Sequence, residues 1–114
     1  MALSVTVHGF ITYDGSQSAG RWATADITNE DGADTLIWTV PANCTYQALA
    51  VSITNRAPST ASYVALAISD QPSPSASDFI ESNASLVSSG VLERTQLLLA
   101  SGDNIFVRWG TPSP

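Results

Sequence analysis

The chain contains no lysine, and its positive charge comes from four arginines set against ten acidic residues. Only 12% of the 114 residues are charged, about half the usual share, and the formal net charge is −6 at pH 7. Binding to a nucleic-acid backbone or to an anionic membrane surface depends on clustered lysine and arginine side chains. The composition therefore predicts a protein that binds neither nucleic acid nor membranes.

Cysteine and long apolar runs are also scarce. Cys44 is the only cysteine, so a disulfide within the chain is impossible, and we expect a small buried or half-buried residue there. No apolar run approaches the length that a transmembrane helix needs. The first residues show neither a basic stretch nor a continuous apolar stretch, so we expect no secretory signal.

Groups that carry out chemistry are sparse. His8 is the only imidazole, and no Gly-x-Ser-x-Gly turn accompanies it, so the sequence nominates no Ser-His-acid triad and His8 is expected on a polar strand face. Asp26, Glu30, Asp31 and Asp34 lie close together in sequence, but their spacing does not fit a twelve-residue calcium loop, which favours a solvated hairpin loop. We therefore predict no enzyme activity, no metal site and no cofactor.

The pattern that is present is alternation of apolar and other side chains. It is clearest over residues 3–7, 49–53, 64–68 and 105–109 and weaker over 10–13, 22–28, 35–40 and 91–99. A two-residue period places every second side chain on one face of a strand, which puts Leu49, Val51 and Ile53 on the core face of their strand. Turn-forming residues recur about every ten positions, a spacing typical of sandwiches and barrels.

We therefore predict a single all-β domain over residues 1–114, an antiparallel β-sandwich of jelly-roll or immunoglobulin-like type with about seven or eight short strands. Gly9 is expected to form a β-bulge in the first strand. Residues 77–82 are predicted as one helical turn, capped by Ser75 or Ser77, that docks Phe79 and Ile80 on the core. The proline-containing residues 111–114 are expected to form a short arm.

Aromatic residues and arginines remain as candidates for binding. Trp38 is expected in the core, whereas tryptophans and tyrosines elsewhere suit either a subunit interface or a sugar-stacking face. Arginine forks match carboxylates such as Glu93 or Asp103, although an exposed strand arginine also discourages edge pairing. Six residues are the predicted interface candidates: Arg56, Arg94, Arg108, Trp22, Trp109 and Glu93.

Five short segments also carry a resemblance. They are Asn55-Arg56 at a strand end and residues 64–68, 78–81, 90–95 and 101–108. In order and spacing this pattern resembles a small β-sandwich domain of tailed-phage virion proteins, notably those of phages that infect cyanobacteria and marine bacteria. It spans a little over half the chain, and none of its pieces is a catalytic motif.

The resemblance implies a non-enzymatic virion structural protein, made in the host cytoplasm and located on the particle surface. Because the 114 residues leave nothing for a fibre shaft, we expect an accessory protein that cements or decorates the capsid. Its implied partners are the major capsid protein or other virion proteins and copies of itself, with a homotrimer favoured. The alternative is a carbohydrate-binding host-recognition module at the tail, neck or fibre.

Overall fold

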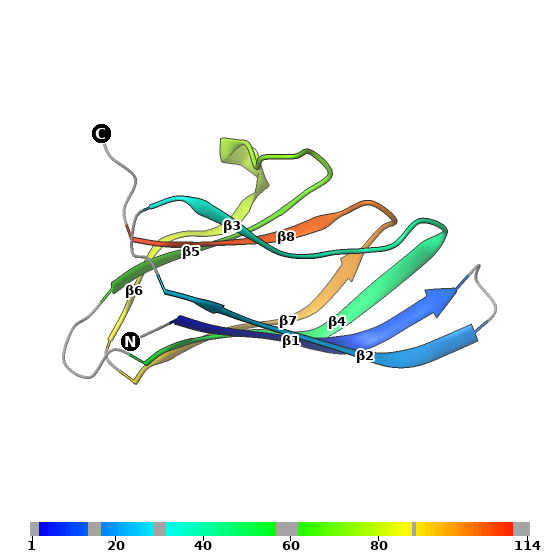
Figure 1. Cartoon of the computed structure of the whole chain (residues 1–114), viewed down its shortest axis with the longest axis horizontal. Coiled ribbons are helices and arrows are strands. Elements are labelled where there is room, and N and C mark those ends of the chain that lie inside the picture. The colour runs from blue at the N-terminus through cyan, green and yellow to red at the C-terminus, as the bar shows by residue number, and fades with distance from the viewer. Residues whose placement is uncertain (1–2, 14–16, 29–31, 57–61, 88, 111–114) are drawn as a thin grey trace.

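The computed structural model describes residues 3–13, 17–28, 32–56, 62–87 and 89–110. Within these ranges the chain forms eight strands and one short 3-10 turn, arranged as two antiparallel sheets packed face to face (Figure 1). Sheet A has the order β2 (Gln17–Ile27), β1 (Leu3–Tyr13), β4 (Cys44–Asn55) and β7 (Val91–Leu99). Sheet B has the order β3 (Asp34–Thr39), β8 (Asn104–Trp109), β5 (Ser62–Ser69) and β6 (Phe79–Leu86). The predicted all-β antiparallel sandwich is confirmed.

The order of the strands identifies the kind of sandwich. Only β1–β2 and β5–β6 are consecutive neighbours within one sheet, and the other consecutive strands lie in opposite sheets. If β2 is lettered B and β1 is lettered I, the two sheets read BIDG and CHEF, which is the order of a jelly roll. The chain thus follows a circularly permuted jelly roll, in which the usual last strand comes first.

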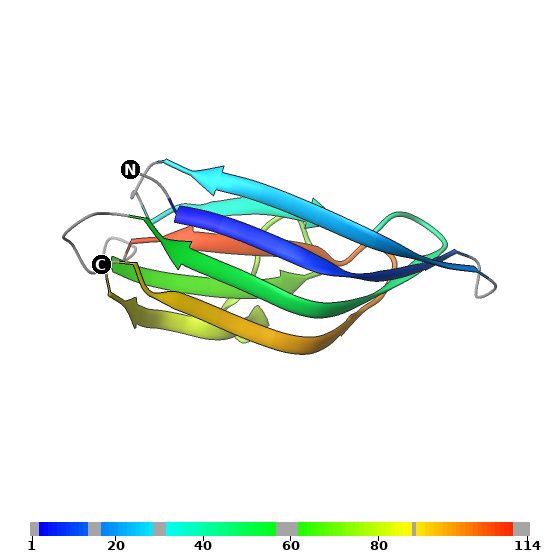
Figure 2. The same cartoon turned by 90° about the horizontal axis from the view of Figure 1, so that it is seen from below.

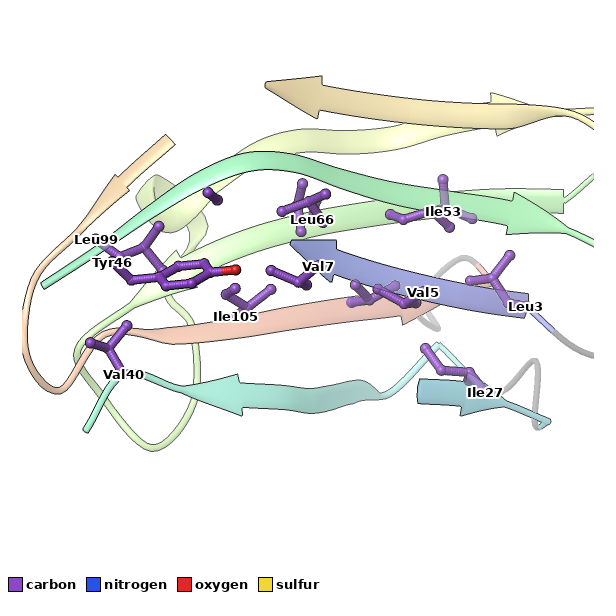
Figure 3. Close-up of a cluster of buried hydrophobic side chains, with 14 of the residues drawn as sticks. Leu3, Val5, Val7, Ile27, Val40, Tyr46, Ile53, Leu66, Leu99 and Ile105 are labelled. Carbon is purple, nitrogen blue, oxygen red and sulfur yellow. The ribbon is translucent and has the colours of Figure 1, made fainter. Parts of the chain in front are cut away.

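The core lies between the sheets and follows the predicted alternation. Leu3, Val5 and Val7 of β1 face Leu66 and Ile105 of sheet B, and all five are at most 1% exposed (Figure 3). Burial of such branched side chains contributes about 1.5–3 kcal/mol each and is the main force holding the sheets together. The alternating stripes therefore account for the layered architecture.

A register shift occurs at Gly9 as predicted, but the bulged strand is β4 and not the first strand, and the bulge overturns one detail of the alternation. The pairing of β1 with β4 shifts between His8 and Gly9, because β4 has one extra residue there. Core-facing positions of β4 are consequently Tyr46 and Ala48 before the shift and Val51 after it, while Leu49 is 40% exposed. The prediction that Leu49 faces the core was wrong, because a one-residue bulge reverses which face each side chain occupies.

The predicted helical turn was only partly right. The 3-10 turn covers Ala76–Asp78, one residue after Ser75, and Phe79 already begins strand β6. Asp78 holds the turn in place by accepting hydrogen bonds from the backbone N–H and the hydroxyl of Ser75, at 2.8 and 3.0 Å. Ile80 packs against the core from β6, as an edge-strand residue. The predicted arm at residues 111–114 lies outside the described residues.

Candidate protein-interaction surface

The outer face of sheet A carries exposed hydrophobic side chains on three neighbouring strands. Phe10 of β1 pairs with Gln47 of β4, and Gln47 pairs with Leu98 of β7, so the three form one row across the sheet. Directly paired residues share a face, and Leu49, two positions after Gln47, also points outward. Phe10, Leu49 and Leu98 are 47%, 40% and 81% exposed. Figure 2 views the molecule from the side of this face, with the four strands lying side by side.

The surroundings of this row are polar but uncharged. The outward neighbours are His8 and Thr12 on β1 and Thr45 on β4, and Phe10 pairs on its other side with Gly20 of β2. Among the outward positions described in this half of the face, none is an aspartate, a glutamate or an arginine. We call Phe10, Gln47, Leu49 and Leu98 the sheet A patch.

The acidic residues of this face lie toward its other end. Asp26 on β2 pairs with Ser4, whose hydroxyl lies 3.3 Å from its carboxylate, and an Arg56 nitrogen lies 3.2 Å from the same carboxylate. Glu93 on β7 accepts a 2.9 Å hydrogen bond from the hydroxyl of Ser52. Charge on the outer face of sheet A is therefore separated from the patch.

Part of the outer face of sheet B is covered by the chain itself. The segment from Asp70 to Asp78, which we call the cover segment, rises above sheet B on the side away from sheet A (Figure 1). Asn104 holds it down by donating from Nδ2 to the carbonyl of Gln71 at 3.0 Å. Phe106, on the outer face of β8, is only 4% exposed, whereas Leu36 on β3 and Tyr63 on β5 are 53% and 49% exposed. The cover segment therefore shields only part of sheet B.

Arg108 forms the most enclosed ion pair among the described residues. Its Nε and one terminal nitrogen donate to both carboxylate oxygens of Asp34, at 3.0 and 3.2 Å, across the β3–β8 pair. Its guanidinium carbon also lies 4.6 Å from the centre of the Phe79 ring. The two charged side chains are 17% and 23% exposed, so this interface candidate links β3, β8 and β6 within the chain.

Arg94 connects the two sheets. It lies on the edge strand β7, opposite the core residue Val51, and its guanidinium reaches Glu81 on the edge strand β6 at 2.9 Å. Its partner is therefore not the neighbouring Glu93, which is bonded to Ser52. Arginine–carboxylate pairing occurs, but the predicted partners were wrong: Glu93 bonds to Ser52, and Asp103 accepts a 2.8 Å hydrogen bond from the backbone N–H of Ala100.

Arg56 and its neighbour Asn55 lie at the end of β4. The ion pair of Arg56 with Asp26 is exposed, with side-chain exposures of 49% and 63%. Asn55 is fully buried and donates from Nδ2 to the carbonyl of Leu86 at 3.0 Å, while its backbone bonds to Ser89 and Gly90. This asparagine fixes the β6–β7 connection, so the Asn-Arg pair combines a buried anchor with a surface charge.

The tryptophans occupy different environments. Trp109 is 5% exposed and belongs to the core, so it offers almost no area to a partner. Trp38 packs at the edge of the core, with its ring centre 4.7 Å from that of Tyr46 in an edge-to-face arrangement. Trp22 pairs with His8 through the backbone, and its side chain lies outside the described residues. Neither Trp38 nor Trp109 belongs to an open stacking face.

Two ionisable groups have shifted pKa values, and both shifts arise from structural roles. Burial raises the pKa of Tyr46 above its usual 10.0, partly opposed by the charge of Arg21, whose carbonyl accepts the phenol hydrogen bond at 3.1 Å. Hydrogen bonds from the Ser75 backbone and from the Ser69 and Ser75 hydroxyls lower the pKa of Asp78. These groups lie in the core and in the cover segment, away from the sheet A patch.

The acidic residues do not gather around one point. Asp26 and Asp34 each pair with a different arginine, and Glu30 and Asp31 lie outside the described residues. Within the described ranges no group of three or more metal-ligating side chains occurs. The same ranges also contain no helix with the length and hydrophobicity needed to span a membrane.

The sequence did not point to the patch, although one signal was present. Three consecutive leucines, at 97–99, cannot all face the core of a strand, so at least one must point outward. Comparison with models of known protein families, with curated protein sequences and with solved structures gave no match.

Proposed function

We propose that this protein is a non-enzymatic structural component of a tailed-phage virion that cements or decorates the capsid surface. The observation that carries the proposal is the sheet A patch, an exposed apolar row on an otherwise hydroxyl-rich, uncharged part of a rigid sheet. Exposed apolar residues grouped in this way are typical of protein–protein contact sites. The resemblance of five segments to virion β-sandwich domains supplies the class of particle.

The internal ion pairs support a mechanical role. Arg108–Asp34 ties neighbouring strands of sheet B, and Arg94–Glu81 ties the edge of sheet B to the edge of sheet A. A sandwich held in this way presents its faces and loops in fixed positions, which an adhesive protein needs because flexible surfaces lose more entropy on binding. Its partners would be the major capsid protein or other virion proteins, with a homotrimer as the assembly that the resemblance implies.

The test is the position of this chain in the particle whose genome encodes it. A cryo-EM reconstruction of the intact virion should show the eight-stranded sandwich at regular positions of the head lattice. Capsids purified from a phage lacking the gene should regain this density when the purified protein is added. A reconstruction without copies on the shell would remove the proposal.

A carbohydrate-binding module at the tail or neck is the second candidate. It is favoured by the exposed ring of Phe10 among the hydroxyl groups of Thr12 and Thr45, a setting in which aromatic rings stack on sugars. Glycan-array binding that is lost in Phe10→Ala or Trp22→Ala, together with copies at a single vertex, would support this candidate. Absence of glycan binding by the unmodified protein would remove it.

A further inference from the structure

We infer that the sheet A patch is a homotypic interface, which packs face to face against the same patch of a second copy of this chain. The inference concerns the occupant of the surface and does not depend on the phage assignment. It gives a twofold dimer in place of the homotrimer that the resemblance implies, and it leaves any capsid contact to other parts of the chain. It rests on the chemistry of the exposed side chains, on where the charges of the face lie, and on the area available.

The chemistry of the patch suits contact with itself. Apolar side chains are self-complementary, and Gln47, at the centre of the row between Phe10 and Leu98, has an amide that both donates and accepts hydrogen bonds. A residue close to a twofold axis meets its own copy, which a carboxylate or a guanidinium cannot do without repulsion. The geometry therefore points to a twofold axis passing near Gln47.

The distribution of charge favours the same axis. Each copy has a net charge of −6, so two copies attract only where the facing surfaces are uncharged. Glu93 pairs with Ser52, five residues along β4 from Gln47, or about 17 Å at the usual rise per residue. A twofold axis that lies in the interface at Gln47 and runs across the strands places the two Glu93 side chains about 34 Å apart, well beyond the screening length of about 8 Å.

The area is sufficient for a weak, specific contact. Four strands spaced about 4.8 Å apart give a face about 19 Å wide. From the Phe10 row the strand β1 continues only to Tyr13, so a twofold overlap extends about 10 Å to either side. Each copy then contributes on the order of 400 Å², and the total of about 800 Å² is below the range of stable interfaces, which makes the contact a weak one.

The prediction is a dimer with a dissociation constant on the order of micromolar. Sedimentation velocity from 1 µM to 1 mM should show the mass rising from 11.9 kDa for one chain toward twice that value. Leu98→Glu should raise the dissociation constant at least about 10-fold, because it places a charge in the contact. Leu36→Glu is the matched control, since Leu36 is 53% exposed on β3 of the other sheet and should leave the mass unchanged.

A charge exchange at Gln47 tests the axis itself. Gln47→Glu and Gln47→Arg should each be monomeric, because each variant places like charges opposite one another. An equimolar mixture should regain the dimer mass, since the two variants then meet with opposite charges. Far-UV circular dichroism of each variant should match the unmodified protein, as position 47 is exposed.

The outcomes separate clearly. A protein that stays monomeric at 1 mM overturns the inference, and so does a dimer or trimer that is insensitive to Leu98→Glu. A mixture of the Gln47 variants that stays monomeric overturns the twofold axis. A Leu98→Glu protein that loses the dimer but still binds capsids would confirm the homotypic contact and show that the capsid binds elsewhere, whereas a dimer without any capsid binding would refute only the proposed function.

Discussion

Replacing Gly9 by alanine should destabilise the protein strongly, because the backbone of β4 approaches this position too closely for a side chain. A Cβ atom built on Gly9 would lie 2.0 Å from the carbonyl oxygen of Gln47 and 2.9 Å from the Cα atom of Ala48. Real Cβ atoms do not come closer than about 3.0 Å to such atoms. The two central strands of sheet A would have to separate by about 1 Å at the bulge.

The expected cost follows from what that separation breaks. Loss of one or two strand-pairing hydrogen bonds costs about 1 kcal/mol each, and forcing extra volume into a packed site costs about 1–3 kcal/mol more. The free energy of unfolding of Gly9→Ala should therefore fall by about 2–4 kcal/mol. For a domain near 100 residues this lowers the melting temperature by about 8–15 °C.

Gly20→Ala is the matched control on the neighbouring strand. Gly20 pairs with Phe10, and a Cβ atom built there has no heavy atom within 4 Å. Its unfolding free energy should change by less than about 0.5–1 kcal/mol, in either direction. Urea titration followed by tryptophan fluorescence measures both variants. A Gly9→Ala protein within about 1 kcal/mol of the unmodified one would refute the close approach of β1 and β4.

Three further predictions concern ionisable groups. Asp34→Asn should lower the unfolding free energy by about 1–2 kcal/mol, because Arg108 stays partly enclosed without its counter-ion. Asp26→Asn, in the exposed pair with Arg56, should lower it by less than about 0.5 kcal/mol. Equal losses for the two variants in urea titration would contradict this prediction. The lowered pKa of Asp78 stabilises the folded protein above pH 3.8, the usual pKa of the group, and this stabilisation is lost as the pH falls through the folded-state pKa. The difference in urea midpoint between the unmodified protein and Asp78→Asn should therefore shrink below about pH 4. The raised pKa of Tyr46 gives a stabilisation that is present below pH 10.0 and lost as the pH rises above it, so the unmodified protein should lose stability above pH 10 more steeply than Tyr46→Phe.

The architecture was predictable because it depends on local periodicity. A two-residue apolar period needs no knowledge of the partner strand, and it placed Leu3, Val64 and Ile105 correctly in the core. The irregular pairing at Gly9 was recognisable because a strand that is otherwise rich in branched residues tolerates glycine mainly where backbones approach closely, although the bulge itself lies in β4. Both signals are contained in a window of a few residues.

The partners of the charged residues were not predictable in the same way. Arg108 and Asp34 are 74 residues apart in sequence, and they meet only because β3 pairs with β8. Glu93 was the obvious carboxylate for Arg94, but adjacent residues of a strand point to opposite faces, so Arg94 turns toward Glu81 instead. Pairing of this kind requires the strand order, which periodicity alone does not contain.

The sheet A patch has a structural cause that links the bulge to the proposed surface. Leu49 is the extra residue of β4 relative to β1, and it lies opposite Gln96 of β7, which has a φ of 60°. A glutamine in this left-handed region costs on the order of 1–2 kcal/mol. The turn at Gln96 exchanges the inward and outward positions of β7 at the same row where Leu49 exchanges them in β4, so the two strands stay in register. The paired reversal turns Leu49 and Leu98 outward and brings Tyr46, Leu97 and Leu99 onto the core side. Without it the period of two would bury Leu49 and Leu98 and expose the other three, so the reversal buries more apolar surface than it exposes. The exposed apolar row is thus the other side of a reversal that fills the core, and the proposed protein contact is what would cover it.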